Sequence, residues 1–401
     1  MAVLGEEPVR IPFVFGAGRA CPVRPTLFRS FFQGGFESST HFRGCDGGRV
    51  DVLAATGHDR HATDDYRALA EHGIVTVRDG LRWHNIEAAP GRYDWHSARA
   101  QVDAARATGC QVIWDLLHYG WPEWLDIWRP EFVARFAAFA CAAAETISGE
   151  IAGPRFYAPV NEISFFSWAG GEVGYFNPFA HGRGFELKVQ LVRASVAAME
   201  AIRAVDPSAR FVHADPAINV ICDPARPEEA IEAEGHRQAQ FQAWDMLGGR
   251  SWPQAGGKPD LLDILGVNYY HNNQWVHGSG PIDVGDPLYK PFRTILAETY
   301  ARYGRPIFVA ETGIEGDRRA AWLAYVCAEV RAAMASGVPV EGVCLYPVLD
   351  HPGWDDGRYC PNGLLGFTPG SGVRVADPAL AAELHRQRRD FAAWFGRIAE
   401  P

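Results

Sequence analysis

The feature that most constrains this chain is a regular alternation of short apolar segments with longer helix-like ones. The apolar segments have the length of buried strands and lie at 31–36, 74–78, 111–116, 155–160, 210–214, 262–268, 306–310 and 342–346. The helix-like stretches lie at 63–72, 97–108, 130–148, 185–205, 228–247, 291–303, 317–336 and 378–398. Eight strand–helix units predict a closed, parallel (β/α)8 barrel rather than an open sheet.

The length and the helix ends fit this barrel. A chain of 401 residues suits one barrel with long loops, so we expect a single domain over 1–401. Gly73 and Gly109 stand where helices should end before a strand, and Pro130 and Pro378 where helices should begin. Pro- and Gly-rich stretches at 248–259 and 276–287 predict surface loops.

Composition bears on partners and location. The net charge of −10 argues against nucleic acid as a partner. No run approaches the roughly 18 apolar residues of a membrane span, and segment 1–10, with two Glu and no apolar core, is not a signal peptide. The eight cysteines form no CxxC pair, which favours a reducing, cytoplasmic location. These patterns do not define an oligomeric state.

Two glutamates stand at strand ends, where barrels of this kind place their reacting groups. Glu162 follows the fourth strand and Glu311 the seventh. These strands face each other across the barrel mouth, so the two carboxylates can converge on one bond. Glycoside hydrolysis needs such a pair, about 5–5.5 Å apart when the anomeric configuration is retained. The sequence therefore predicts a glycosidase site.

Other strand-end residues supply fitting roles. Arg78 and Tyr270 can hold Glu311 ionised by hydrogen bonding. Asn161 and His118 can bind sugar hydroxyls, and Trp354 can form an apolar floor. A single Glu or His is usually structural, but every member of this set follows a strand. The agreement in position indicates one site.

The sequence gives no signal for a metal or a cofactor. His58 and His61 are three residues apart, but we expect them in a loop before the first helix. A phosphate-binding Gly-rich loop followed by Lys and Ser or Thr is not found. A metal-dependent barrel hydrolase is therefore unsupported.

The strand-end segments resemble clan A of the glycoside hydrolases, and in particular family 1, the β-glucosidase family. Phe-Tyr-Ala-Pro-Val-Asn-Glu at 156–162 resembles the family's fourth strand, whose Glu is the acid/base. Phe-Val-Ala-Glu-Thr-Gly at 308–313 resembles its seventh strand, whose Glu is the nucleophile. The resemblance implies a retaining β-glycosidase acting on a small soluble glycoside, with Glu162 as acid/base and Glu311 as nucleophile.

Further blocks extend the resemblance in the family's order, from about residue 31 to residue 367. Leu-Leu-His-Tyr-Gly-Trp-Pro at 116–122 resembles Leu-Tyr-His-Trp-Asp-Leu-Pro, whose His contacts the sugar. Gly-Val-Asn-Tyr-Tyr at 266–270 resembles Gly-Ile-Asn-Tyr-Tyr, and Arg78 with Trp83 fits the second-strand pattern. The strand ends and these blocks together give six substrate-binding candidates, namely Arg78, His118, Trp121, Asn161, Asn268 and Tyr270.

The chain departs from family 1 where that family binds the distal sugar hydroxyls. His41 stands in place of a sugar-binding Gln, and Gly353 in place of a sugar-binding Glu. Asp350 and Trp354 are kept. The resemblance therefore does not imply specificity for glucose.

Three carboxylates are candidates to replace the missing Glu: Glu37, Asp355 and Asp356. With His41, Asp350 and Trp354, Glu37 completes the substrate-binding set that we predict. Tyr346-Pro347 replaces the family's Trp-Ser, and we expect a cis peptide there because proline lowers its cost.

Two other functions remain open on the same barrel. The altered sugar-binding residues also suit a transglycosylase or a glycosidase of specialised metabolism. A carbohydrate-binding protein without catalysis is the third reading, but it gives no reason for both glutamates to occur together with Arg78.

Overall fold

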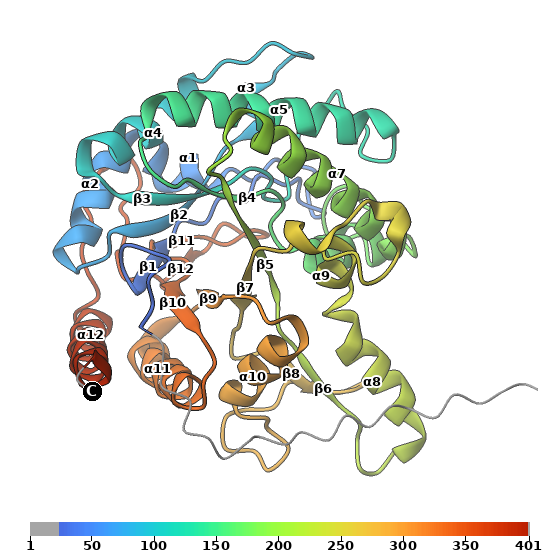
Figure 1. The fold of residues 1–401 in the computed structure, drawn as a ribbon, viewed down its shortest axis with the longest axis vertical. Coiled ribbons are helices and arrows are strands. Elements are labelled where there is room, and N and C mark those ends of the chain that lie inside the picture. Colours follow the sequence, from blue (N-terminus) through green and yellow to red (C-terminus); the bar gives the residue numbers. More distant parts are fainter. Residues whose placement is uncertain (1–23, 400–401) are drawn as a thin grey trace, which may run out of the picture.

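The computed structural model describes residues 24–399, and its central strands close into a parallel barrel (Figure 1). Each predicted strand is present within two residues of its expected bounds. In their order around the barrel the strands are β1 (Phe32–Gly35), β2 (Thr76–Gly80), β3 (Gln111–Asp115), β4 (Phe156–Ala158), β5 (Arg210–Pro216), β7 (Ile264–Asn268), β9 (Ile307–Thr312) and β10 (Val340–Leu345). The predicted (β/α)8 barrel is confirmed.

Helices surround the barrel where the sequence predicts them (Figure 1). They are α2 (His58–Glu71), α4 (His96–Thr108), α5 (Pro130–Glu150), α7 (Gly184–Val205), α10 (Phe292–Tyr303), α11 (Arg319–Ala335) and α12 (Pro378–Ala399). Gly109 ends α4 with a φ of 69°, and Pro130 begins α5, as expected. Gly73, with a φ of 74°, follows the end of α2.

The single helix predicted over 228–247 is wrong, because α8 (Ala230–Ala239) and α9 (Gln242–Leu247) are separate. Gln240 lies between them, and its side chain accepts from the backbone N–H of Ile218 and donates to the Ile218 carbonyl. This pair of hydrogen bonds ties the chain to another loop at the point where the helix is interrupted.

Several short elements were not predicted. They are the helices α1 (Val52–Thr56), α3 (Trp83–Ile86) and α6 (Ile163–Phe166), a π-helical turn over Ser167–Glu172, and the strand pairs β6 (Asn219–Ile221) with β8 (Gln274–Val276) and β11 (His351–Pro352) with β12 (Tyr359–Cys360). All lie in the connections between barrel strands and outer helices. The loops of this chain therefore carry more structure than their composition indicates.

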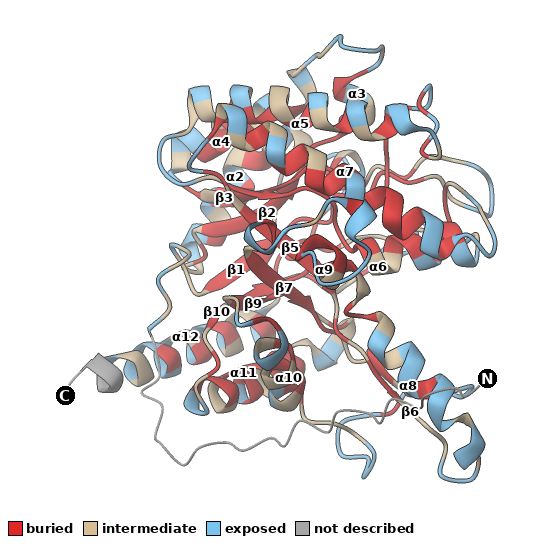
Figure 2. Ribbon diagram, turned by 45° about the vertical axis from the view of Figure 1, so that its right-hand side comes forward, coloured by how far each residue is buried: buried red, intermediate tan, exposed pale blue. Residues whose placement is uncertain are grey.

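Apolar side chains fill the barrel toward the end at which the strands begin. Polar groups occupy the opposite end, at which the strands finish. The interior cluster consists of Ile113, Phe156, Ala158, Val212, Ala214, Ile264, Phe308 and Ala310. Phe28, which precedes β1, closes this end, with its ring centroid 5.1 Å from Phe156 and 5.0 Å from Phe308. Buried residues concentrate on the strands and on the inner sides of the helices (Figure 2).

Helix α5 is long and apolar enough to cross a membrane by length and composition alone. Its aromatic side chains Phe132, Phe136 and Phe139 are nevertheless fully buried. Their ring centroids lie 5.1 to 5.7 Å from that of Trp83 in α3. The apolar side of α5 is thus covered by the rest of the protein.

His58 and His61 lie within α2 and not in the expected loop. His58 is fully buried, and its ring nitrogens contact Oδ2 of Asp65 at 2.7 Å and Oδ2 of Asp79 at 2.8 Å. Within residues 24–399, no group of three or more His, Cys, Asp and Glu side chains is arranged to hold a metal ion. His58 instead joins α2 to β2 through its contact with Asp79, while its contact with Asp65 stays within α2.

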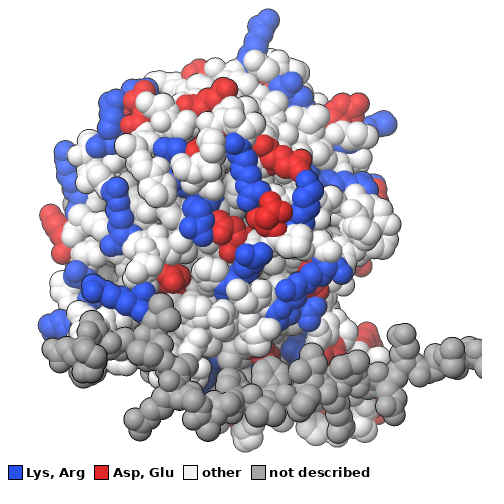
Figure 3. All heavy atoms as spheres, in the orientation of Figure 1, with Lys and Arg blue, Asp and Glu red and all other residues white. Residues whose placement is uncertain are grey.

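Lys and Arg side chains alternate with Asp and Glu over the face in Figure 3, so the net negative charge is not gathered into one patch there. The seven cysteines that the structure describes are free thiols. Segment 1–10, which we expect not to be a signal peptide, lies outside the described residues.

Candidate active site

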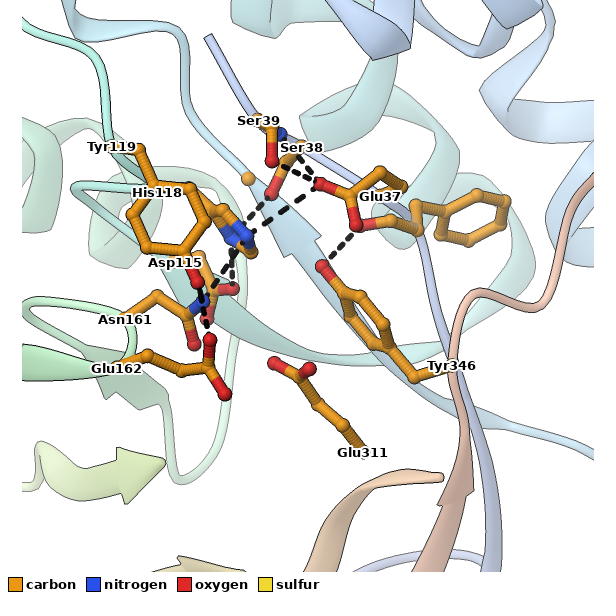
Figure 4. Close-up of polar contacts among 12 residues, drawn as sticks. Glu37, Ser38, Ser39, Asp115, His118, Tyr119, Asn161, Glu162, Glu311 and Tyr346 are labelled. Carbon is orange, nitrogen blue, oxygen red and sulfur yellow. Dashed lines mark hydrogen bonds and ion pairs between the residues drawn. The ribbon is translucent and has the colours of Figure 1, made fainter. Parts of the chain in front are cut away.

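The two glutamates predicted to react lie at the carboxyl ends of β4 and β9 and point toward each other (Figure 4). Glu311 is in β9, paired in register with Asn268 of β7. Glu162 follows β4 and directly precedes α6. Both are buried, with 8% of Glu162 and 4% of Glu311 exposed. The structure therefore brings together the pair that the sequence singles out.

Arg78 connects three acceptors from different strands. Its Nη1 donates to Oε1 of Glu311 at 2.8 Å, and its Nη2 donates to Oδ2 of Asp115 at 2.6 Å. Nη2 also donates to Oδ1 of Asn161 at 2.9 Å. The predicted contact between Arg78 and Glu311 is confirmed, and Asp115 is an additional partner.

The two carboxyl groups have different hydrogen-bond donors. Tyr270 donates its hydroxyl to Oε2 of Glu311 at 2.8 Å, so a phenol and a guanidinium share that carboxyl group. Glu162 accepts from Nδ2 of Asn268 at 2.8 Å and from the hydroxyl of Tyr119 at 2.5 Å. The direct hydrogen bonds of Glu162 thus come from uncharged groups.

Both carboxyl groups have raised pKa values. Burial raises the pKa of Glu162 to about 7, although the hydrogen bonds from Tyr119 and Asn268 oppose it. Burial, and after it the charge of Glu162, raise the pKa of Glu311 above its usual value against the opposing charge of Arg78. Arg78 lowers the pKa of Glu311, as its predicted role requires, but burial and Glu162 outweigh it and leave the pKa above its usual value. Two buried carboxylates in one site repel each other, so near neutral pH the pair holds one proton.

A third carboxylate, Glu37, lies just after β1 on the other side of the site (Figure 4). Its Oε1 accepts from the backbone N–H of Ser39 at 3.0 Å and lies 3.6 Å from Nε2 of His118. Burial raises the pKa of Glu37, but His118, His351 and the hydrogen bonds from Ser39 together outweigh it and lower the pKa. Glu37 is therefore ionised at neutral pH.

His118 links Glu37 to the barrel wall. Its Nδ1 contacts Oδ2 of Asp115 at 3.2 Å and the hydroxyl of Ser38 at 3.1 Å. Nδ2 of Asn161 donates to its Nε2 at 3.1 Å. The predicted residues His118, Asn161 and Glu37 thus belong to one connected group.

His41 and Trp354 lie beside this group. The centroid of the buried His41 ring is 4.7 Å from that of Trp354 and 5.0 Å from that of Phe176. Burial lowers the pKa of His41 to about 4, so its ring is neutral. Among the described residues, its buried Nδ1 has no hydrogen-bond partner.

Two predicted residues have their polar atoms engaged elsewhere. Asp350 accepts from the backbone N–H of Gly363 at 2.6 Å and from the hydroxyl of Tyr359 at 2.7 Å. Trp121 is buried, and its Nε1 donates to the carbonyl of Leu125 at 2.9 Å. Within residues 24–399, neither side chain forms a hydrogen bond or ion pair with Glu162 or Glu311.

The three candidates to replace the missing Glu are placed differently. Asp355 accepts from the hydroxyl of Tyr175, and Asp356 accepts from the backbone of Arg358. Glu37 alone of the three contacts His118. A Cβ added at Gly353 would lie 2.7 Å from Oδ1 of Asp356, so this position faces the β11–β12 turn. The expected cis peptide at Tyr346-Pro347 is confirmed.

Sequence reasoning missed three residues with close contacts at the site. They are Tyr119, Asp115, and Asp215, whose carboxylate accepts from the backbone and hydroxyl of Ser164 beside Glu162. Asp115 ends β3 and Asp215 lies near the end of β5. The last residues within the strands, and not only the residues that follow each strand, therefore indicated the site.

Comparison with curated proteins gives one weak relative. No family model matches the chain. A β-galactosidase of Sulfolobus acidocaldarius is 24% identical over 324 residues, which cover 67% of this chain and 64% of that protein. The chain thus spans less than two thirds of the length of the curated relative that it matches.

Solved structures with a similar fold include β-glycosidases. The family 1 β-glucosidase from Thermotoga maritima has a TM-score of 0.73 at 17% identity, covering 90% of this chain and 98% of that one. A Thermotoga maritima β-glucosidase in complex with glucoimidazole has a TM-score of 0.74 at 16% identity, covering 92% and 99%. The β-glycosidase of Thermosphaera aggregans has a TM-score of 0.73 at 16% identity, covering 90% and 96%.

These comparisons define the class of protein at the level of the fold. The chain forms a (β/α)8 barrel of the β-glycosidase type, and its resemblance to clan A and family 1 is confirmed for the fold.

Proposed function

We propose that this protein is a retaining β-glycosidase that acts on a small soluble glycoside by double displacement. Glu311 attacks the anomeric carbon while Glu162 gives its proton to the leaving oxygen. Glu162 then takes a proton from the water that releases the sugar from Glu311. The observation that carries this proposal is the pair of buried, facing carboxyl groups (Figure 4).

The assignment of the two roles follows from their donors. A guanidinium and a phenol at 2.8 Å favour the charged form of Glu311. Glu162 has only neutral donors in direct contact, so the shared proton is best placed on Glu162. After Glu311 is glycosylated its charge is lost, which lowers the pKa of Glu162 and lets it act as a base.

The glycone binds, in this proposal, between the glutamate pair and Glu37. His118 and Asn161 offer polar atoms there, and Trp354 offers an apolar face. Arg78 is already engaged with Asp115 and Glu311, and Glu37 adds a negative charge. We therefore expect a neutral glycone and not a uronic acid or a sugar phosphate.

The wider predictions remain part of the proposal. Trp121, Asp350, Asn268 and Tyr270 complete the predicted substrate-binding set. The described residues build one barrel with its loops, which supports a single catalytic domain over 1–401. The free thiols are compatible with the cytoplasm as the place of action.

Azide rescue tests the two roles. On a panel of aryl β-glycosides, Glu311→Ala and Glu162→Ala should each lose several orders of magnitude in rate. Azide should restore turnover in both, giving the α-glycosyl azide with Glu311→Ala and the β-glycosyl azide with Glu162→Ala. The opposite pairing of products would reverse the roles, and unchanged rates in both variants would refute the proposal. Added alcohols distinguish a transglycosylase, in which transfer products dominate over hydrolysis.

A further inference from the structure

The phenol of Tyr119 lies against Glu162 and is not explained by the mechanism above. Tyr119 follows His118 after β3 and is 1% exposed. Its hydroxyl donates to Oε2 of Glu162 at 2.5 Å, and Nδ2 of Asn161 donates to the same hydroxyl at 3.1 Å. The corresponding position of the family 1 segment holds Trp, so this phenol is a feature of the present chain.

The backbone on both sides of this hydrogen bond is unusual. Tyr119 has a φ of 67° and Glu162 a φ of 45°, in the left-handed region that non-glycine residues rarely adopt. Such conformations persist where the surroundings impose them, and they concentrate at functional sites.

The surroundings of Tyr119 impose its conformation. Nδ2 of Asn177 donates to the Tyr119 carbonyl at 3.1 Å. A Cβ at the next residue, Gly120, would lie 2.1 Å from Oγ1 of Thr40, so the chain passes very close to the loop after β1. The ring packs on Phe166 and Phe176, with centroids 5.5 and 5.2 Å away. The hydroxyl is thus fixed in place before any substrate binds.

The chemistry explains what a fixed donor does at this position. When Glu162 gives its proton to the leaving oxygen, a buried carboxylate forms there. An unpaired buried charge is strongly disfavoured, and prearranged donors aimed at it stabilise the transition state. Asn268 serves one oxygen of Glu162 and Tyr119 the other.

We propose that Tyr119 is a further catalytic residue, whose hydroxyl stabilises the Glu162 carboxylate as it forms and holds it aligned to act as base. This role rests on the proposed function of Glu162. Both steps need it, because the carboxylate is the product of the first step and the reactant of the second.

Other titratable and charged groups also face Glu162 or Tyr119. They are Glu37 after β1, Arg78 in β2, His118 after β3, Asp215 in β5, Tyr270 after β7, Glu311 in β9, and His41. Replacing Tyr119 by Phe changes none of these charges. A shift in the titration of Glu162 in that variant therefore reports the loss of one hydrogen bond.

Two tyrosine variants give a matched pair, because Tyr119 and Tyr270 each donate to one glutamate. In a profile of kcat/KM against pH, the basic limb reports Glu162 and the acidic limb Glu311. Loss of a donor raises the pKa of a carboxyl group. Tyr119→Phe should move the basic limb to higher pH by about one to two units, the usual effect of a hydrogen bond to a charged group. Tyr270→Phe should instead raise the acidic limb. A basic limb that stays in place in Tyr119→Phe overturns the proposal.

Titration of the free protein separates this proposal from the proposed function. With 13C-labelled Glu carboxyl groups, the NMR signal absent from Glu162→Gln identifies Glu162. Its midpoint should rise in Tyr119→Phe. If it rises in a protein that hydrolyses no glycoside, the contact stands and the hydrolase function falls. If it does not move in an active enzyme, the role of Tyr119 falls. Should Tyr119→Phe fail to fold by circular dichroism, 3-fluorotyrosine at 119, a stronger donor, should move the basic limb to lower pH.

Discussion

Replacing Arg78 by Met should destabilise the protein strongly. Arg78 is fully buried, and Met removes its charge while keeping much of its length. The guanidinium makes five hydrogen bonds, to Asp115 twice and to Glu311, Asn161 and the Ala310 carbonyl. Loss of one partner of a buried ion pair typically costs about 3–5 kcal/mol, because the other charge stays buried. Arg78 serves two such carboxylates, so we expect the upper part of this range at pH 8.

The cost should depend on pH with a definite sign. In the wild type, the charge of Arg78 and contacts with His118 lower the pKa of Asp115 despite burial, so this group contributes stability above its unfolded pKa. Without Arg78, burial raises the pKa of both Asp115 and Glu311 above their unfolded values. Both then bind protons on folding, which favours the folded state at low pH. The destabilisation should therefore be smaller at pH 5 than at pH 8.

Urea unfolding at the two pH values, followed by Trp fluorescence and far-UV circular dichroism, measures this difference. The double variant R78M/D115N should recover at least about 1 kcal/mol, because it removes one of the unpaired charges. A loss below about 1 kcal/mol at pH 8, or the same loss at both pH values, would refute the reasoning.

Three further variants test other parts of the structure. Glu37→Gln should lower kcat/KM about 10- to 100-fold, the effect of losing a hydrogen bond that a sugar hydroxyl donates to a charged group, whereas Asp356→Asn should leave it nearly unchanged. Gly353→Glu should not raise kcat/KM on glucosides, because the new side chain starts toward Asp356, and a rise would show that the family's sugar contact is recoverable. Burial lowers the pKa of His58, but Asp79 and Asp65 outweigh burial and raise this pKa to about 9. Stability of the order of 3 kcal/mol should therefore be present below pH 6.5 and lost as the pH rises through 9. Urea unfolding between pH 6 and 10 should show this fall in the wild type and not in His58→Gln.

The barrel could be predicted because its signals are local. Each strand is a short apolar segment bounded by a helix end, as at Gly109 before β3, and eight such units leave little choice of topology. Glu162 and Glu311 could be predicted because parallel strands all present their carboxyl ends at one end of the barrel.

Contacts between side chains could not be predicted in the same way. The hydrogen bond from Tyr119 to Glu162 depends on two left-handed backbone conformations that nothing in the local sequence requires. The raised pKa of Glu311 depends on how far burial and Glu162 outweigh Arg78, which only the packed site determines. The break between α8 and α9 coincides with hydrogen bonds from Gln240 to a loop distant in the chain.

Trapping the glycosyl-enzyme tests the central claim most directly. A 2-deoxy-2-fluoro β-glycoside with a good leaving group, in the configuration that the enzyme hydrolyses, should inactivate the wild type. Mass spectrometry of the proteolysed protein should then place one sugar on Glu311. A label on another residue, or inactivation of Glu311→Gln at the same rate, would contradict the assignment of the nucleophile.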